Sequence, residues 1–195
     1  MGHSCGIMTH SRILFDGKGL KLKDLGDGVR EIEFDLVGES ANRFSSLMLA
    51  DLNAAWSIVE KDADARGVLM TTAKDGFFVG ADVTEFIDHF KKSDADLEKW
   101  LWSTQELFSR IDDSKIPVVC LIRGFALGGG FEAALTAHFR LATPDAKVGL
   151  PETKLGIFPG WGGTVRLTRL CGADLAIEWI CGGAANAATE ALKVG

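Results

Sequence analysis

Gly-Phe-Ala-Leu-Gly-Gly-Gly-Phe-Glu, residues 124–132, is the stretch that decides the fold of this chain, because it joins a strand pattern to a helix pattern. Before it, Pro117–Ile122 is apolar, contains β-branched residues and carries proline only at its first position, which predicts a buried strand. After the glycines, the alanine-rich residues 131–138 predict a helix. Glycines permit a tight turn and close approach, and the N–H groups at a helix start are unpaired at the positive end of the helix dipole. The stretch therefore predicts a site that stabilises an oxyanion, with a tight turn that binds nothing as the open alternative.

The spacing of residues excludes several other sites. A dinucleotide-binding G-x-G-x-x-G pattern needs glycine where Ala126 stands, and a P-loop needs lysine where Phe131 stands. No G-x-S-x-G nucleophile elbow, H-E-x-x-H or C-x-x-C motif occurs. The sequence therefore predicts neither a covalent serine mechanism nor a metal site.

A second stretch, Phe77–Phe86, supplies another candidate turn. Asp82 and Glu85 have the spacing of a capping box, which predicts that a helix begins there. The simplest interpretation of the Asp82 side chain is a helix cap that contacts no ligand. The Ala81 N–H, in the turn before the cap, is a second candidate donor, since an oxyanion hole of two backbone donors needs two such turns side by side.

A third stretch, Val148–Gly163, carries Glu152 between apolar residues, directly after a short predicted strand at 147–150. Burial there would raise the pKa of Glu152 into a range useful for acid–base catalysis, whereas a solvated loop carboxylate is the alternative. Glu132 and Glu152 are 20 residues apart, too far for one helix face. A helix of about eight residues advances ~12 Å and a strand of about five residues returns ~16 Å, so the chain can bring the two together.

The remaining patterns predict an α/β fold with a largely parallel sheet, because strands alternate with helices. Half-buried strands are expected at 20–23 and 32–36, and a buried strand at 67–72. Helices are expected at 48–59, at 97–111 and from about 162 onward, with a strand at 139–143 and a turn at 143–146.

Composition narrows the class of protein. The chain has 195 residues, 47% hydrophobic and 25% charged, which is ordinary for one soluble domain, and its net charge of −6 argues against nucleic acid as a partner. No apolar run approaches the length of a membrane span, so no membrane insertion is expected. The four cysteines lack paired spacing, which favours a reducing, cytoplasmic compartment. Residues 1–11 are expected to be an expression leader or a disordered N-terminus, and residues 12–195 to form the domain.

Three motifs in this order resemble the crotonase, or enoyl-CoA hydratase/isomerase, family: Phe-Val-Gly-Ala-Asp at 78–82, the stretch at 124–132, and Gly-Leu-Pro-Glu-Thr-Lys-Leu-Gly-Ile-Phe-Pro-Gly at 149–160. The runs at 140–145 and 189–195 look most like the branch formed by the N-terminal halves of fatty-acid oxidation complex alpha subunits. The resemblance implies a crotonase-like spiral of repeated β-β-α units whose C-terminal helices are missing from this chain. One departure is Phe131, where many relatives carry cysteine.

The resemblance also implies the site. The thioester carbonyl would lie between the backbone N–H groups of Ala81 and Gly129, with Glu132 activating water for attack on C3 and Glu152 transferring a proton at C2. The substrate-binding positions it implies are Gly80, Asp82, Gly128 and Gly130. Both glutamates together favour hydration of trans-2-enoyl-CoA, and the pocket would also permit Δ3-Δ2 isomerisation.

For partners, the resemblance implies an acyl-CoA substrate, no metal or redox cofactor in this domain, and NAD only for an absent dehydrogenase half. It further implies an oligomer or a complex with a thiolase subunit. Two alternatives stay open: a crotonase acting on another acyl-CoA, and a non-catalytic acyl-CoA-binding or assembly module.

Overall fold

The computed structural model describes residues 11–195. The N-terminal leader expected from the sequence therefore lies almost wholly outside the described residues. Within residues 11–195, no helix is both long and apolar enough to cross a membrane.

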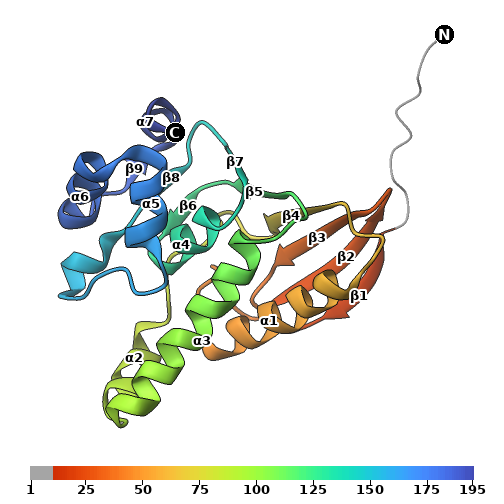
Figure 1. Ribbon diagram of the computed structural model, residues 1–195, viewed down its shortest axis with the longest axis horizontal. Coiled ribbons are helices and arrows are strands. Elements are labelled where there is room, and N and C mark those ends of the chain that lie inside the picture. The colour runs from red at the N-terminus through yellow and green to blue at the C-terminus, as the bar shows by residue number, and fades with distance from the viewer. Residues whose placement is uncertain (1–10) are drawn as a thin grey trace.

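The large sheet has six strands in the order β1-β2-β3-β4-β5-β7 (Figure 1). The first three pair antiparallel and the rest pair parallel, which confirms the predicted largely parallel sheet. Its strands are β1 (Arg12–Asp16), β2 (Leu20–Gly26), β3 (Val29–Phe34), β4 (Gly67–Thr72), β5 (Val118–Ile122) and β7 (Phe139–Ala142). Alternate residues of β3, β4 and β5, and Leu20 and Leu22 of β2, are buried. This alternation agrees with the half-buried strands expected at 20–23 and 32–36, whereas 67–72 and 117–122 were expected to be buried throughout and are buried at alternate residues only.

A second, smaller sheet contains β6 (Phe125–Leu127), β8 (Lys147–Gly149) and β9 (Asn186–Ala187). Two isolated parallel bridges, Phe44 with Ala81 and Phe78 with Ala126, continue its pairing toward the N-terminal half. Each parallel strand of the large sheet is thus followed by a short extended segment that pairs with its counterpart in the next unit, and then by a helix. This is the repeated β-β-α arrangement that the family resemblance implied.

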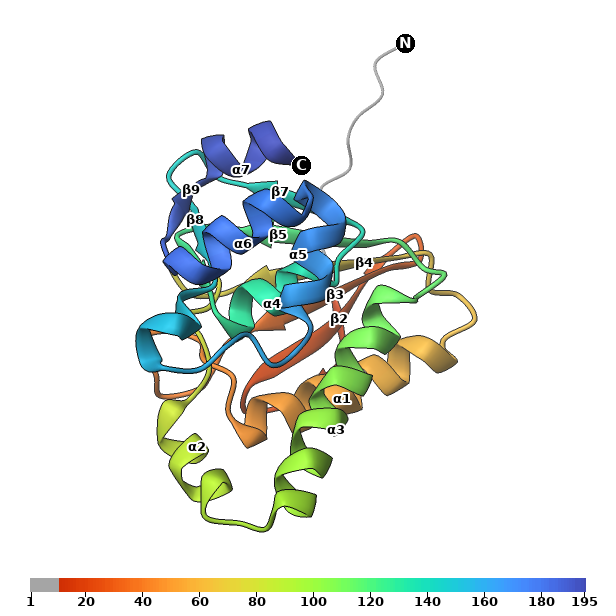
Figure 2. The same cartoon turned by 60° about the vertical axis from the view of Figure 1, so that its left-hand side comes forward.

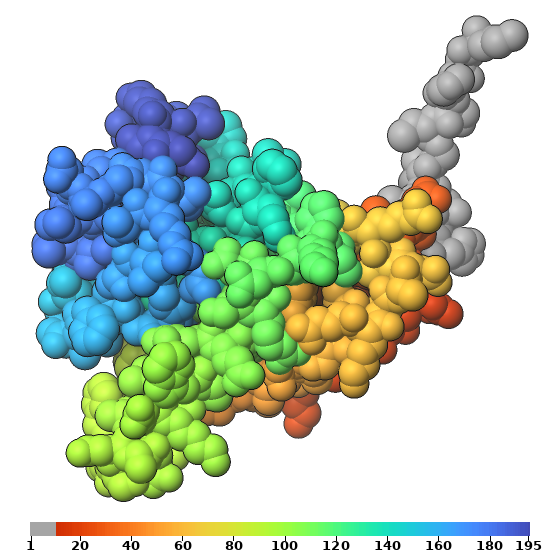
Figure 3. All heavy atoms as spheres, in the orientation of Figure 1, coloured from red at the N-terminus to blue at the C-terminus, as the bar shows by residue number. Residues whose placement is uncertain are grey.

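The helices lie around these sheets. Figures 1 and 2 both show α1 and α3 side by side across the large sheet, where α1 contacts β2 and α3. In the space-filling view the tip formed by α2 and the start of α3 protrudes from the body (Figure 3). The helices are α1 (Ser46–Lys61), α2 (Val83–Phe90), α3 (Asp94–Asp112), α4 (Gly129–Leu135), the 3-10 turn η1 (Pro151–Leu155), α5 (Gly163–Cys171), α6 (Ala173–Gly182) and α7 (Ala188–Val194).

The structure corrects several boundaries. Helix α4 begins at Gly129 and ends at Leu135, not at 131 and 138. It ends early because the Thr136 hydroxyl donates to the Ala133 carbonyl at 2.7 Å and competes with further helical turns. Strands β1, β6 and β9 and the turn η1 were not predicted. Strands β6 and β9 are three and two residues long and are defined by their pairing with β8.

An aromatic cluster joins the two halves of the core. The Phe44 and Phe78 rings stack with centroids 4.3 Å apart, and Trp161 meets Phe44 and Phe108 edge-on at 5.9 Å each. Such pairs contribute about 0.5–1.5 kcal/mol each beyond burial. Trp161 is thereby held firmly beside α4 and α3.

The buried side chain of Asn42 forms hydrogen bonds that connect successive β-β-α units. Its Oδ1 accepts from the Leu36 N–H at 3.0 Å, and its Nδ2 donates to Thr72 Oγ1 at 2.9 Å and to the Phe77 carbonyl at 3.2 Å. The residue is 0% exposed. Asn42 therefore joins the ends of β3 and β4 to the segment that leads to Ala81.

Replacing Asn42 with alanine should lower the free energy of unfolding by about 2–4 kcal/mol, because buried N–H and carbonyl groups lose their partners. Urea denaturation followed by tryptophan fluorescence measures this. The control is Asn186→Ala, which removes the same amide from a half-exposed position with a 3.4 Å hydrogen bond to Ala184. The control should change stability by less than about 0.5 kcal/mol. Equal losses in both variants would contradict the role of Asn42.

Candidate functional site

A pocket of about 450 Å³ lies where α2, α3, the start of α4, η1 and the segment 156–161 meet. Six of the eight site residues expected from the sequence line it together: Gly80, Ala81, Gly128, Gly129, Glu132 and Glu152. Asp82 and Gly130 are not part of the lining. The rest of the wall is mostly apolar and comes from α2, α3 and the segment after η1.

The Ala81 turn is fixed by backbone pairing with Phe44. The Phe44 N–H donates to the Gly80 carbonyl at 3.0 Å, and the Asp82 N–H donates to the Phe44 carbonyl at 2.8 Å. In such a parallel bridge the N–H of the intervening residue points to the opposite side, here away from Phe44. Within residues 11–195 the Ala81 N–H has no hydrogen-bond acceptor, so it is free to donate to a ligand.

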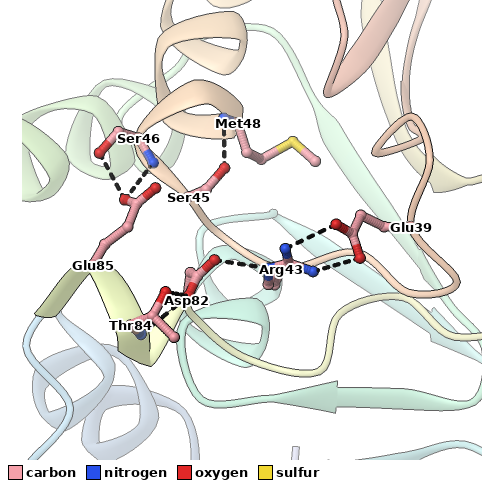
Figure 4. A network of polar contacts seen from close by, with 8 residues as sticks. All are labelled: Glu39, Arg43, Ser45, Ser46, Met48, Asp82, Thr84 and Glu85. Carbon is pink, nitrogen blue, oxygen red and sulfur yellow. Dashed lines mark hydrogen bonds and ion pairs between the residues drawn. The ribbon is translucent and has the colours of Figure 1, made fainter.

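Polar contacts of Asp82 and Glu85 also hold the Ala81 turn (Figure 4). Asp82 Oδ1 accepts from the Thr84 N–H at 3.0 Å and caps α2, while Oδ2 accepts from Arg43 Nε at 2.8 Å. The hydrogen bond from Thr84 and, to a smaller extent, the contact with Arg43 hold the pKa of Asp82 below its usual value. Glu85 Oε2 accepts from the Ser46 N–H at 2.8 Å, tying α2 to the first residue of α1. The predicted cap is confirmed, and since Asp82 does not line the pocket, its place here is to hold the turn rather than to bind substrate as the family resemblance implied.

The Gly129 turn lies beside the Ala81 turn. Gly129 is the first residue of α4, so its N–H has no acceptor within the helix. Gly128 has φ +53°, and a Cβ placed on it would lie 3.3 Å from Glu152 Oε1 and 3.7 Å from the Gly80 Cα. Glycine at 128 thus allows the two turns and Glu152 to meet.

Gly130 has a packing role. A Cβ at this position would lie 2.2 Å from the Phe78 Cβ, so α4 packs directly on Phe78. Phe131 points to neither turn: it lines a separate apolar pocket with Leu135, Leu167 and Trp179. The departure from the family pattern at Phe131 therefore falls behind the site and outside the pocket that holds the carboxyl groups.

Glu132 is buried and firmly oriented. The residue is 2% exposed. Its Oε1 accepts hydrogen bonds from the backbone N–H groups of Trp161 and Gly163, both at 2.8 Å. Burial raises the pKa of Glu132 to about 7; the hydrogen bond from Gly163 opposes this, and the negative charge of Glu152 adds to it. The pKa of Glu132 is thus raised by burial and by a second carboxylate in the same pocket.

Glu152 is buried without the same support. It is 8% exposed, and its Oε2 is a buried atom that has no hydrogen-bond partner within residues 11–195. Burial also raises the pKa of Glu152 to about 7. An unpaired buried carboxyl oxygen is costly to a folded protein, and it is commonly found where a ligand or a proton binds.

The role of residues 159–163, the end of the third stretch, is the part of the site that the sequence did not predict. The N–H groups of Trp161 and Gly163 hold Glu132, although they lie about 30 residues further along the chain. The available signal was the run Gly160-Trp161-Gly162-Gly163 ahead of a helix, the same type of pattern as at 128–130. In the part of the chain that the structure describes, no group of three or more His, Cys, Asp and Glu side chains is placed to hold a metal ion.

This constellation has known counterparts. The sequence model of the enoyl-CoA hydratase/isomerase family matches residues 25–195. This chain belongs to that family. It is 49% identical over 183 residues to the fatty acid oxidation complex subunit alpha of Pseudomonas aeruginosa (strain LESB58), and 48% identical to that of Pseudomonas entomophila. Each alignment covers 94% of this chain but 26% of the relative, so the chain spans about a quarter of their length.

Solved structures agree on the fold. The enoyl-CoA hydratase of Geobacillus kaustophilus superimposes with a TM-score of 0.87 at 26% identity, over 95% of this chain and 69% of the other. The enzyme from Thermoplasma volcanium superimposes with a TM-score of 0.83 at 30% identity, over 91% of this chain and 69% of the other. The predicted crotonase fold is confirmed.

The raised pKa values make stability depend on pH in a defined direction. A carboxyl group whose pKa rises on folding holds its proton more tightly in the folded state, so its contribution is present below its unfolded pKa and is lost as pH rises through the folded value. For Glu132 this window runs from 4.5 to about 7.

Glu132→Gln keeps an acceptor for the two N–H groups but cannot ionise. Its free energy of unfolding relative to the wild type should therefore rise by about 2–3 kcal/mol between pH ~4.5 and pH ~8. Urea denaturation at both pH values measures the difference. The matched control, Glu178→Gln on the exposed face of α6, should give a difference near zero, and a flat result for Glu132→Gln would show that Glu132 ionises without cost.

Proposed function

We propose that this chain is an enoyl-CoA hydratase domain of fatty-acid β-oxidation, which adds water across the 2,3 double bond of trans-2-enoyl-CoA to give 3-hydroxyacyl-CoA. The observation that carries the proposal is two buried carboxyl groups with pKa near 7 in one pocket with the N–H groups of Ala81 and Gly129, which have no acceptor among residues 11–195. Acid–base catalysis is most efficient with groups that titrate near the working pH.

In the proposed reaction the thioester oxygen accepts hydrogen bonds from the Ala81 and Gly129 N–H groups. Ionised Glu132 takes a proton from a water molecule while the oxygen of that water forms a bond to C3. The electron pair of the double bond moves toward the thioester oxygen. Protonated Glu152 then gives its proton to C2, so one water is added and the two carboxyl groups exchange protonation states. Each oxyanion donor in comparable sites contributes about 2.7–4 kcal/mol.

Two features support this division of labour. The pKa of each group is raised to about 7, so the hydrogen bonds distinguish them: Glu132 Oε1 is oriented by two N–H donors, as a base requires, whereas Glu152 Oε2 has no hydrogen-bond partner among residues 11–195. Mutual repulsion of neighbouring carboxylates also favours one shared proton in the pair.

The shape of the pocket supports a fatty acyl substrate. Beyond the carboxyl groups its wall is formed by apolar side chains: Val83, Phe86, Phe90, Leu97, Trp100, Leu101, Leu155, Ile157 and Phe158. Several of these, including Phe90 and Phe158, are substantially exposed, so an acyl chain bound there would remove a sizeable apolar area from water. In the same pocket Glu152 could also move a proton between C2 and C4, which is Δ3-Δ2 isomerisation.

The named relatives suggest the setting. They are subunits of a fatty acid oxidation complex, and this chain matches about a quarter of their length. We therefore propose that residues 12–195 form the hydratase domain of a multifunctional cytoplasmic subunit that associates with a thiolase. The hydration itself needs no metal or redox cofactor, while NAD would serve a dehydrogenase domain elsewhere in such a subunit.

The hydratase proposal predicts that this chain consumes crotonyl-CoA, with loss of the conjugated thioester absorbance. Glu132→Gln and Glu152→Gln should each lower kcat by about 10²–10⁴-fold, because each removes one acid–base group while preserving side-chain volume. Glu178→Gln is the matched control and should keep full activity.

The alternatives give different results in the same assay. Turnover of 3-enoyl-CoA but not crotonyl-CoA would indicate an isomerase. Acyl-CoA binding without turnover of either would indicate a non-catalytic binding or assembly module. Undiminished hydration by either glutamine variant would overturn the mechanism of two carboxyl groups.

A further inference from the structure

The orientation of Glu132 depends on a loop that belongs to a different part of the chain. Both N–H donors, from Trp161 and Gly163, converge on the single oxygen Oε1 at 2.8 Å. The loop has little room to move there, since a Cβ on Gly163 would lie 3.0 Å from that same oxygen. Whatever fixes this loop therefore fixes the carboxylate.

Arg166, in the first turn of α5, anchors the loop. Its Nη1 donates to the Trp161 carbonyl at 2.9 Å, its Nε to Asp112 Oδ2 at 2.9 Å, and its Nη2 to Ser109 Oγ at 3.3 Å. Arg166 is 8% exposed, so this is a buried guanidinium with three directed contacts. A buried arginine is retained only where its donors are well paired.

The anchoring partners form one stripe on α3. Gln105 Nε2 donates to the Gly160 carbonyl at 2.7 Å, and Ser109 and Asp112 accept hydrogen bonds from Arg166. Positions 105, 109 and 112 are four and three residues apart, so they share one helix face. Helix α3 therefore holds the loop through its backbone carbonyl groups, directly or through Arg166, while the backbone N–H groups of the same loop hold Glu132.

We propose that Arg166 is a positioning residue for Glu132: by joining the Trp161 carbonyl to Ser109 and Asp112 of α3, it fixes the two N–H donors that orient Glu132 Oε1. The catalytic consequence of this inference rests on the proposed hydratase function. Its structural part, the coupling between Arg166 and the Glu132 carboxylate, stands without it.

The charges around Glu132 set the direction of the expected effect. Burial and the Glu152 charge from η1 raise its pKa, while the N–H groups of Gly163 and Trp161 and the Arg166 charge lower it. Asp112 neutralises part of the Arg166 charge through their ion pair. Loss of Arg166 removes a favourable charge and loosens the two N–H donors, so both effects raise the pKa of Glu132 and shift the ionised form to higher pH.

The test compares Arg166→Met with Arg30→Met in the full 195-residue chain. Arg30 is a matched control, since it is 5% exposed and forms buried ion pairs with Asp24 and Asp62, between β2, β3 and the end of α1. Gln105→Leu is a second variant that keeps the Arg166 charge but removes the other anchor of the loop. Arg166→Lys restores the positive charge at the same position.

Two readouts separate positioning from folding. Carboxyl ¹³C NMR of glutamate-labelled protein follows the titration of Glu132 directly, and kcat for crotonyl-CoA against pH follows its catalytic consequence. Arg166→Met should move the Glu132 titration and the acid limb of kcat upward by about one pH unit, which is roughly a tenfold loss of kcat below the limb. Gln105→Leu should shift both in the same direction by less, Arg166→Lys should recover part of the shift, and Arg30→Met should shift neither.

The inference is overturned if folded Arg166→Met titrates as the wild type does, or if Arg30→Met shifts Glu132 equally. Should Arg166→Met fail to fold, Gln105→Leu and Arg166→Lys decide the matter, and a wild-type titration in both overturns it. A wild-type chain that does not hydrate crotonyl-CoA, together with an NMR shift in Arg166→Met, would defeat the hydratase proposal and support the coupling.

Discussion

The structure depends on lateral backbone pairing between short segments that follow the parallel strands of the large sheet. Phe44 pairs with Ala81, Phe78 with Ala126, and β6 with β8. Each segment is too short to be stable alone, and the hydrogen bonds with its neighbours keep it extended. Because the segments run parallel and in register, the turns that follow them meet at one edge, where the N–H groups of Ala81 and Gly129 and the Glu152 side chain are found.

The pocket combines two opposing demands on the carboxyl groups. Burial raises the pKa of both, which suits acid–base work but disfavours the ionised form. At Glu132 the fold offsets this with two N–H donors and the nearby Arg166, whereas at Glu152 one oxygen has no partner in the described part of the chain. Two chemically identical side chains thereby acquire different environments, which is how one site can hold both a base and an acid.

Local signals predicted much of the fold. The capping-box spacing marked the start of α2 at Asp82, and the apolar run before residue 124 marked β5. Other features escaped because their cause is not local. Strand β6 exists only by pairing with Phe78 and β8, and η1, which carries Glu152, packs against α6. A window of sequence contains neither neighbour.

The sequence alone determined which groups are available for chemistry: two carboxyl groups, a glycine-rich helix start, a second turn ahead of a helix cap, and no nucleophile elbow or metal motif. These depend on residue type and short spacing, which are visible along the chain. Only the tertiary structure decided that the turns meet, that both carboxyl groups are buried, and that Arg166 on α5 holds the loop that orients Glu132. Desolvation and hydrogen bonding act through space, between residues that are tens of positions apart, so their effect on pKa and orientation appears only once the chain is folded.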